Sequence, residues 1–358
     1  MKRTGAGEGE TAKKAADIRE VARRAGVSIS TVSRYLNHKV VSPAAERRIE
    51  EAIRELAYLP NRIARSLKMK RTMTLGMVIP DITNPYFPEV VKGVDMAARA
   101  AGFNLILANA GEDPVIEWEH MQTMRGLRCD GVLLIPAPNV GVDEVERARR
   151  LDAFPLPLVF IDRSLKLDRD IVVSDNVRSA GEAVRHLLRL GHTRIGLLDT
   201  TLDVSSHRDR AEGYLQTMKE AGLGPDPRYV VRAVPTVADG FAATVKMLEA
   251  NPPPTALFVP SNRSTIGALQ AVSARGLRCP DDISLVSYDD YEWQEAFRPR
   301  LTTVAQPAFL LGQRGAEVLI NRITSESDAP SEQVVLSSRL VVRESCGIYS
   351  ERPSPGKG

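Results

Sequence analysis

The chain has 358 residues, of which 43% are hydrophobic and 26% are charged, and its formal net charge is +3. No apolar run approaches the length of about 18 residues that a transmembrane helix needs, and the N-terminus is polar, so we expect a cytoplasmic protein without membrane contact. The three cysteines are scattered without nearby histidine, and the nucleotide-binding and nucleophile-elbow glycine motifs are absent. We therefore expect no cofactor, no metal site and no catalytic residues.

Charge is distributed unevenly along the chain. Residues 1–72 hold 17 Lys and Arg against 8 Asp and Glu, a net of +9, whereas the other 286 residues hold 31 against 37, a net of −6. A strongly basic segment joined to an acidic remainder is the electrostatic footprint of a nucleic-acid-binding module.

The first predicted elements, which follow a tail at 1–15 expected to be disordered, form a helical hairpin. Asp17 with Glu20 three residues later is the pattern of a helix N-cap. Apolar residues then recur at helical spacing, at Ile18, Val21, Ala22 and Ala25. Gly26 can end this helix in the left-handed conformation and Ser28 can cap a second one, so the sequence predicts a helix-turn-helix. The outer face of the second helix then carries Ile29, Ser30, Ser33, Arg34 and Asn37. A generic helical hairpin is the alternative, which the basic charge disfavours.

A third helix and a short fourth segment follow. Ser42 and Pro43 are typical of a helix start, and apolar residues recur at helical spacing up to Leu56. Pro60 stops this helix, and Asn61–Lys68 offers an N-cap and about two turns of helix. Since isolated helices below roughly 12 residues are marginal in water, we expect this segment to fold only when something packs against it.

From residue 73 onward, apolar strands alternate with helical patterns. The predicted strands are 73–79, 103–108, 131–135, 158–161, 194–198, 255–259 and 283–288, and predicted helices include 88–101, 177–190, 208–221 and 240–250. This alternation is typical of parallel sheets covered by helices on both faces, and the length requires two such α/β lobes. The closing residues 347–358, rich in Pro, Gly and Ser, are predicted to be disordered.

Polar segments follow five of the strands. They are Asn84–Phe87, Asp162–Arg163, Ser205–Arg210, Asn262–Arg263 and Asp289–Asp290. Because ligands bind at the carboxyl ends of strands in open sheets, these segments predict a site for a small hydroxylated ligand bracketed by Tyr86 and Phe87. Packing in the core explains the two aromatic residues equally well.

Six segments occur in a characteristic order and spacing: Gly26–Asn37, Tyr58–Leu67, Ile79–Phe87, Leu190–His192, Arg210–Tyr214 and Ser287–Asp290. Together they resemble the LacI/GalR (lactose-repressor) family of bacterial transcription regulators over about residues 16–345. The resemblance implies an α/β protein with a three-helix helix-turn-helix head at 16–60, a hinge helix and linker at 61–72, and a two-lobed periplasmic-binding-protein-like body with parallel sheets at 73–346. The expected N-lobe is 73–163 plus 292–325, and the expected C-lobe is 164–291 plus 326–346.

The resemblance also implies functional residues. The expected DNA-binding set is Ser28, Ile29, Ser30, Thr31, Ser33, Arg34, Asn37, Asn61, Arg62, Ala64 and Leu67. Among these, Ser30 and Arg34 are expected to read bases in the major groove, and Leu67 is expected to act as a wedge in the minor groove. The expected effector-binding set is Tyr86, Phe87, Asp162, Arg163, Arg210, Asn262 and Asp289.

One departure from the family bears on the ligand. Where relatives commonly have Asn-Asp, this chain has Ser261-Asn262-Arg263, which removes a carboxylate and adds a guanidinium. With Arg163, Arg208 and Arg210 nearby, the pocket would be more cationic than a site for a neutral sugar, so the expected effector is a sugar, a sugar acid or a sugar phosphate. The alternative is that Arg163 or Arg263 points to solvent.

The sequence therefore predicts an effector-controlled transcription regulator rather than an enzyme. We expect a repressor that binds a near-palindromic double-stranded DNA operator as a homodimer. A solute-binding transport protein and a sugar-modifying enzyme on the same two-lobed fold are the alternatives. The basic head disfavours the first, and the lack of a catalytic motif disfavours the second.

Overall fold

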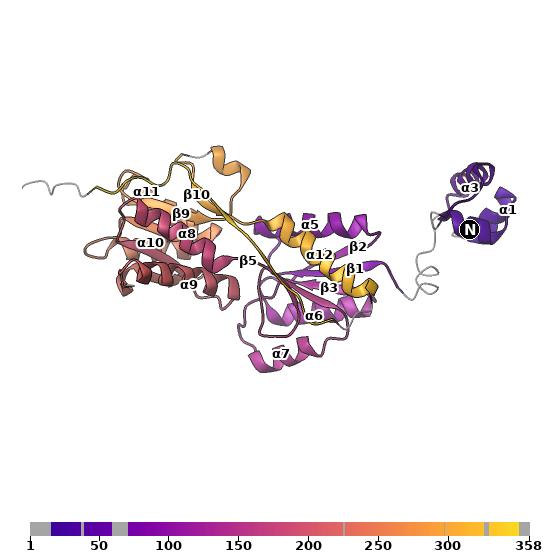
Figure 1. Cartoon of the computed structure of the whole chain (residues 1–358), viewed down its shortest axis with the longest axis horizontal. Helices are drawn as coiled ribbons and strands as arrows, with labels where there is room; N and C mark the ends of the chain where they lie inside the picture. The colour runs from indigo at the N-terminus through magenta and orange to yellow at the C-terminus, as the bar shows by residue number, and fades with distance from the viewer. Residues whose placement is uncertain are drawn as a thin grey trace, which may run out of the picture. The chain divides into compact units, whose positions relative to one another are not determined.

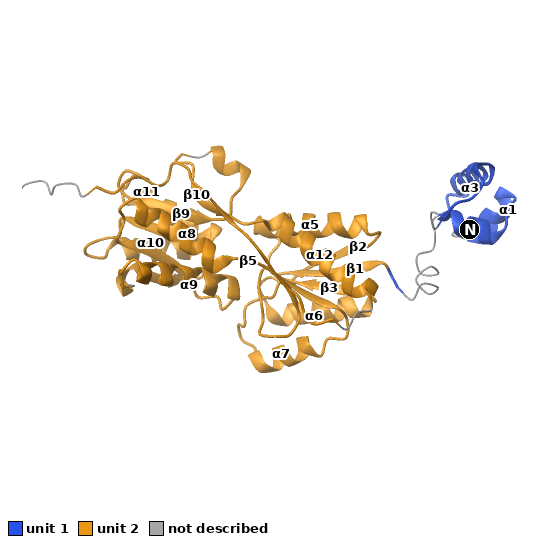
Figure 2. Cartoon of the chain, in the orientation of Figure 1, with its two compact units in different colours: residues 1–72 blue, residues 73–358 orange. Residues whose placement is uncertain are grey.

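The computed structural model describes residues 16–36, 39–58, 71–224, 226–296, 298–325 and 329–350. The chain forms two compact units, residues 1–72 and 73–358 (Figure 2). The smaller unit is helical and the larger is α/β (Figure 1). Within the described ranges, every helix is too short or too polar to cross a membrane.

The smaller unit is a three-helix head, as the sequence predicts. Its helices are α1 (Ile18–Ala25), α2 (Ile29–Leu36) and α3 (Pro43–Glu55). Asp17 and Glu20 form a reciprocal capping box, and Gly26 ends α1 with a φ of 61°. The Ser28 hydroxyl accepts a hydrogen bond from the Thr31 backbone N–H at 3.1 Å and so caps α2. The buried core of the head consists of Val21, Ala22, Ala25, Val32, Ile49, Ala52 and Tyr58.

The first lobe of the larger unit is built on a parallel six-stranded sheet. Its strands are β1 (Thr74–Ile79), β2 (Asn104–Asn109), β3 (Gly131–Leu134), β4 (Leu158–Ile161), β5 (Asp170–Ser174) and β11 (Gln333–Leu336). Their order is β11-β5-β4-β3-β1-β2. Helices α5 (Tyr86–Ala100) and α12 (Ala308–Ser325) cover one face, and α6 (Pro114–Gly126) and α7 (Glu144–Asp152) cover the other (Figure 1).

The second lobe repeats this arrangement. Its strands are β6 (Ile195–Thr200), β7 (Val230–Ala233), β8 (Ala256–Val259), β9 (Ser284–Tyr288), β10 (Thr302–Ala305) and β12 (Arg339–Val341), in the order β12-β10-β9-β8-β6-β7. Only β12 pairs antiparallel among these described strands. Helices α8 (Asn176–Arg189) and α9 (Ser205–Glu220) cover one face, and α10 (Val237–Leu248) and α11 (Asn262–Ala274) cover the other. Short 3-10 helices, η1 (Pro227–Tyr229) and η2 (Glu292–Ala296), complete the lobe. The prediction of two parallel-sheet lobes is confirmed.

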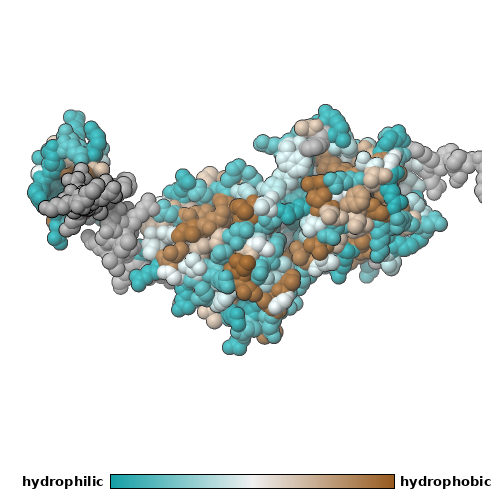
Figure 3. Space-filling model, turned by 180° about the vertical axis from the view of Figure 1, so that it is seen from behind, coloured by the Kyte–Doolittle hydropathy of each residue, from teal (hydrophilic) through white to brown (hydrophobic). Residues whose placement is uncertain are grey.

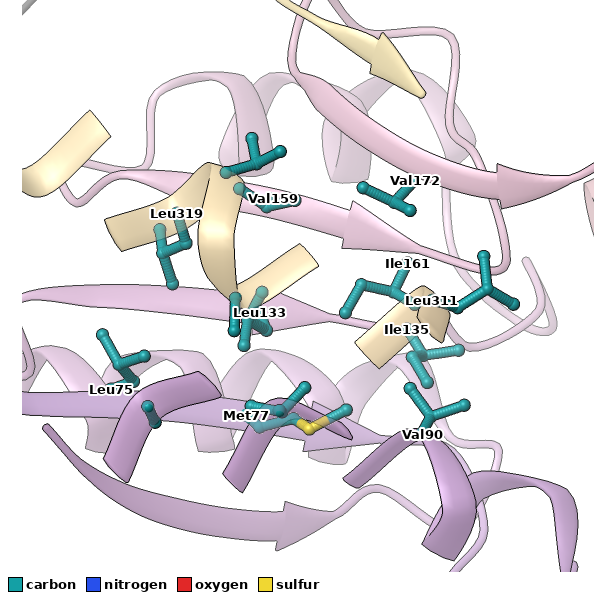
Figure 4. Packing of buried hydrophobic residues seen from close by; sticks show 14 of the residues in the cluster. Leu75, Met77, Val90, Leu133, Ile135, Val159, Ile161, Val172, Leu311 and Leu319 are labelled. Atoms are coloured by element: carbon teal, nitrogen blue, oxygen red, sulfur yellow. The ribbon is translucent and has the colours of Figure 1, made fainter. Parts of the chain in front are cut away.

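The core of the first lobe fills the space between the sheet and helices α5 and α12. Alternate strand residues such as Met77, Leu133 and Ile161 point into it and meet Val90 and Leu311 from the helices (Figure 4). The two helices pack so closely that a Cβ added at Gly312 would lie 1.9 Å from the Val90 carbonyl oxygen. This glycine is therefore required by packing, because no larger side chain fits.

The lobe boundaries differ from those expected. Strands β5 and β11 belong to the first sheet, although 164–174 and 326–336 were assigned to the C-lobe. Strand β10 and η2 belong to the second lobe, although 292–305 was assigned to the N-lobe. The chain passes between the sheets at 174–176, 305–308 and 336–339. These crossings follow the ends of strands β5, β10 and β11, respectively. The crossings therefore come one strand later than the prediction placed them.

The prediction of a disordered tail at 347–358 is wrong for residues 347–350. The Tyr349 backbone N–H donates to the Leu190 carbonyl at 2.8 Å, and the Tyr349 ring lies 5.6 Å from the His192 ring. His192 Nε2 is also 3.1 Å from the Gly347 carbonyl oxygen. An aromatic side chain with partners on the body holds this segment in place, which a composition argument does not detect. The predicted tails at 1–15 and 351–358 lie outside the described residues.

Candidate functional site

Helix α2 presents the predicted DNA-reading face to solvent. Ser28, Ile29, Ser30 and Arg34 are exposed, and Thr31 and Ser33 are half-buried. The Ser28 hydroxyl is 2.7 Å from that of Ser30 and 2.8 Å from that of Thr31, and Arg34 Nη2 donates to the Val40 carbonyl at 3.1 Å. Because this contact is exposed, Arg34 can exchange it for another acceptor at little cost. The other members of the predicted set, Asn37, Asn61, Arg62, Ala64 and Leu67, lie outside the described residues.

A cavity of about 220 Å³ lies between the two lobes of the body. Its walls come from the β1–α5 connection, the ends of β4 and β9, and the first turns of α9 and α11. All seven residues of the predicted effector set line it, namely Tyr86, Phe87, Asp162, Arg163, Arg210, Asn262 and Asp289. The structure thus brings together residues from five separate segments, and their contact with an effector stays a prediction.

The first lobe contributes an aromatic wall with a carboxylate. The Tyr86 hydroxyl donates to Asp162 Oδ1 at 2.7 Å, and the Tyr86 and Phe87 rings meet edge to face at 5.3 Å. Both aromatic residues are buried in the first-lobe core and also line the cavity, so core packing is confirmed and contact with a ligand stays a prediction. Burial, together with the charge of Asp162, raises the pKa of Tyr86 well above its usual value. The tyrosine therefore remains a hydrogen-bond donor.

The second lobe contributes a guanidinium and a second carboxylate. Arg210 Nε donates to Asn176 Oδ1 at 2.9 Å and Nη1 donates to the Pro260 carbonyl at 3.0 Å, while the guanidinium lies 3.9 Å from the Tyr288 ring centroid. Arg210 Nη2 has no hydrogen-bond partner among the described residues. Three protein groups therefore fix the orientation of Arg210 and leave one nitrogen for an acceptor.

Asp289 faces Arg210 and is held by two amides. Asn262 Nδ2 donates to its Oδ2 at 2.9 Å, and Gln306 Nε2 donates to its Oδ1 at 2.7 Å. Burial raises the pKa of the Asp289 carboxyl, and the Arg210 charge partly opposes this shift. Asp162 and Asp289 both adopt a left-handed backbone, with φ of 64° and 69°. This conformation is uncommon for non-glycine residues, and here it occurs directly after the central strands β4 and β9.

The arginines do not make the cavity cationic, so that hypothesis is wrong. Arg163 faces the cavity, but both of its terminal nitrogens donate to the Glu112 carboxylate, at 2.7 and 2.9 Å. Arg263 pairs with Asp81 at 2.8 Å, and Arg208 pairs with Asp203 outside this cavity. The lining holds four carboxylates (Asp81, Glu112, Asp162 and Asp289) against three guanidiniums (Arg163, Arg210 and Arg263). The alternative that Arg163 points to solvent is excluded as well, since Arg163 is 5% exposed.

Among the lining residues outside the predicted set, His207 and Gln306 carry polar groups that a ligand could meet. His207 lies three residues before Arg210 on α9, a spacing that places both on one side of the helix and could have indicated it. Burial, with the charges of Arg210 and Arg163, lowers the pKa of His207 well below 6.5, so its imidazole is neutral. Gln306 has no sequence signal, because it follows the missed strand β10. Its Oε1 atom is buried without a partner among the described residues and is available to a donor.

The fold and these sites define a class of protein: one with a helix-turn-helix head on a two-lobed, ligand-binding body. The family model described as "Bacterial regulatory proteins, lacI family" matches residues 17–61, and the model described as "Periplasmic binding protein-like domain" matches 184–346. The chain belongs to the lacI family of bacterial regulatory proteins.

Several members of this family resemble most of the chain. The ribose operon repressor of Escherichia coli (strain K12) is 36% identical over 314 residues, which are 86% of this chain and 93% of that protein. The HTH-type transcriptional repressor PurR of Haemophilus influenzae (strain PittEE) is 30% identical over 92% of this chain and 98% of its own length. The crystal structure of the lac repressor dimer bound to operator and the anti-inducer ONPF superposes with a TM-score of 0.81 at 27% identity, over 93% of this chain and all of that one. These relatives are transcriptional regulators.

Proposed function

We propose that the protein is a transcription repressor whose binding to a near-palindromic operator is controlled by a neutral, single-ring polyhydroxylated ligand. The observation that carries the ligand class is the cavity between the lobes. Its volume of about 220 Å³ lies below the range of about 300–1,000 Å³ that is usual for sites of drug-sized ligands, which suits a ligand as small as one sugar ring. One of the relatives is named for the ribose operon, so pentoses are the first candidates.

The chemistry of the walls favours a neutral ligand. Sugar hydroxyls both donate and accept, and the cavity offers acceptors at Asp162, Asp289 and Gln306 together with a donor at Arg210. The aromatic faces of Tyr86 and Phe87 suit the apolar side of a sugar ring. A carboxylate or phosphate would instead meet a lining in which carboxylates outnumber guanidiniums.

The operator is bound by a dimer in this proposal. The lac repressor structure that matches this chain is a dimer on its operator, and a symmetric site requires two heads related by a two-fold axis. One face of the body carries apolar patches (Figure 3), and exposed large apolar side chains of the body include Met96, Ile266, Trp293 and Leu310. Such patches are typical of surfaces that a partner covers. In this proposal the protein regulates transcription and catalyses no reaction. It acts in the cytoplasm, where the DNA lies.

Selection from random DNA followed by a ligand screen tests the function. We expect the protein to enrich a near-palindromic sequence, and one of D-ribose, D-xylose, D-glucose or D-galactose to change its affinity for that DNA. Light scattering should give the mass of two chains. A variant without residues 351–358 should also contain two chains per complex. Enrichment of no sequence would contradict the repressor assignment. A response to sugar acids or sugar phosphates alone would contradict the ligand class.

A further inference from the structure

The mouth of the cavity is crossed by side chains that join the two lobes directly. On the first lobe, Asp81, Thr83 and Asn84 follow strand β1. On the second lobe, Arg263 lies in the first turn of α11, and its Nη2 pairs with Asp81 Oδ2 at 2.8 Å and donates to the Thr83 hydroxyl. The preceding Asn262 donates from Nδ2 to Asn84 Oδ1 at 2.9 Å. The start of α11 therefore holds the first lobe by an ion pair and two hydrogen bonds.

The ion pair lies at the rim of the cavity rather than at its base. The side chains of Arg263 and Asp81 are 37% and 21% exposed, whereas Asp162 and Asp289, which line the same cavity, are 3% and 7% exposed. A ligand that reaches the buried carboxylates must pass groups near the rim. The ion pair occupies part of that rim.

We propose that Arg263 and Asp81 form a latch that joins the two lobes at the rim of the cavity and that must open for the ligand to enter. The latch itself is a contact between the two lobes, and its gating role rests on the proposed function.

The half-exposed position of the pair sets the size of the effect. Exposed ion pairs contribute little and are screened by salt, so breaking this one should change an equilibrium or a rate by about two- to fivefold. Such a latch is strong enough to favour contact between the lobes at the rim and weak enough to open often. We therefore expect ligand association to become faster when salt concentration is raised or when Arg263 is removed.

Arg263→Ala tests the latch, with two matched controls. Arg275→Ala removes another exposed ion pair from the end of the same helix, in which Arg275 Nη2 meets Glu249 at 2.5 Å within the second lobe. Arg263→Lys keeps a positive charge opposite Asp81. Asp81→Asn keeps a side-chain oxygen for the Thr83 backbone N–H, which Asp81 Oδ1 now binds at 2.9 Å. This preserves the turn and removes only the charge.

Amide hydrogen exchange of the ligand-free full-length chain gives the first readout. In Arg263→Ala, amide exchange should become about two- to fivefold faster in peptides covering 81–87, which belong to the opposite lobe. Arg275→Ala should leave these peptides unchanged, Arg263→Lys should restore most of the protection, and adding Asp81→Asn to Arg263→Ala should have little further effect. Unchanged exchange at 81–87 in Arg263→Ala would overturn the latch.

Stopped-flow association with D-ribose, D-xylose, D-glucose and D-galactose gives the second readout. The association rate of whichever sugar binds should rise about two- to fivefold in Arg263→Ala and lose much of its dependence on salt, while Arg275→Ala behaves as wild type. Faster exchange without faster association would overturn the gating role. If none of the sugars binds the wild type, the proposed ligand class fails, while the exchange result still decides whether the latch exists.

Discussion

Replacing Asp289 by asparagine removes one negative charge from the base of the cavity without changing its shape. Asparagine also tolerates the left-handed backbone of this position, where φ is 69°. The new amide can accept only one of the hydrogen bonds that the carboxylate now accepts from Asn262 and Gln306, at 2.9 and 2.7 Å. The other donor would face an NH₂ group.

The expected loss of stability is small, because two effects oppose each other. Losing one hydrogen bond to a charged group costs about 1.5–3 kcal/mol. Burial raises the pKa of Asp289, which means that the folded protein destabilises this carboxylate, and a neutral amide relieves that penalty. We therefore expect the free energy of unfolding of the body to fall by only about 1 kcal/mol.

The free energy of sugar binding should change more than the free energy of unfolding, because a sugar hydroxyl that donates to a carboxylate forms a charge-assisted hydrogen bond. Its replacement by a neutral acceptor should weaken sugar binding about 10- to 100-fold. Operator binding without the sugar should be retained, because the head is a separate unit. Calorimetric titration with the sugar, thermal unfolding and DNA-binding anisotropy measure these three quantities.

Asp290→Asn is the matched control. Its carboxylate is the next one along the chain, but it pairs with Arg343 at 2.7 and 3.1 Å and does not line the cavity. This variant should lose stability and keep its affinity for the sugar within about twofold, as expected for a residue without ligand contact. Equal losses of sugar affinity in the two variants would refute the assignment of Asp289 to the ligand.

Three further predictions concern the head, the first-lobe core and pH. Arg34→Ala should weaken operator binding by about 1–3 kcal/mol, as measured by anisotropy. Arg48→Ala removes an exposed cation from α3 and should weaken binding less, to the same extent for all DNA sequences. Gly312→Ala should unfold the body or lower its stability by more than about 3 kcal/mol, because the new Cβ would lie 1.9 Å from a backbone carbonyl oxygen. Gly126→Ala places its Cβ where, among the described residues, no atom beyond its chain neighbours and its own helix backbone lies within 4 Å, so thermal unfolding should show little change. The depressed pKa of His207 contributes stability that is present above pH 6.5 and lost as pH falls below it, so His207→Asn should reduce the fall in the unfolding midpoint between pH 7.5 and 5.5.

Each of these three predictions has a clear contradiction. Equal losses in the Arg34 and Arg48 variants would remove Arg34 from base reading. A stable Gly312→Ala protein would show that α5 and α12 can separate without cost. An unfolding midpoint with the same pH dependence in wild type and His207→Asn would mean that the imidazole is not held neutral in the fold.

The local structure of this protein could be predicted from its sequence because it depends on neighbouring residues. Asp17, Gly26 and Ser42 mark helix ends through hydrogen bonds and backbone preferences that span a few positions. Continuous apolar strands separated by helices required parallel sheets, and parallel strands bring their carboxyl ends to one edge. That rule pointed to the segments that follow the strands, and the family resemblance selected the residues within them that line the cavity.

The charge of the site and the division into lobes were decided by tertiary structure. Arg163 is neutralised by Glu112, 51 residues away, and Arg263 donates to Thr83, 180 residues away, so no local pattern indicates either partner. Strand β11 joins the first sheet beside β5, although about 160 residues separate them along the chain, and the short β5 has polar residues at both ends. Pairing over such separations depends on where the whole chain places two segments, because each partner is chosen by packing and electrostatics rather than by sequence proximity.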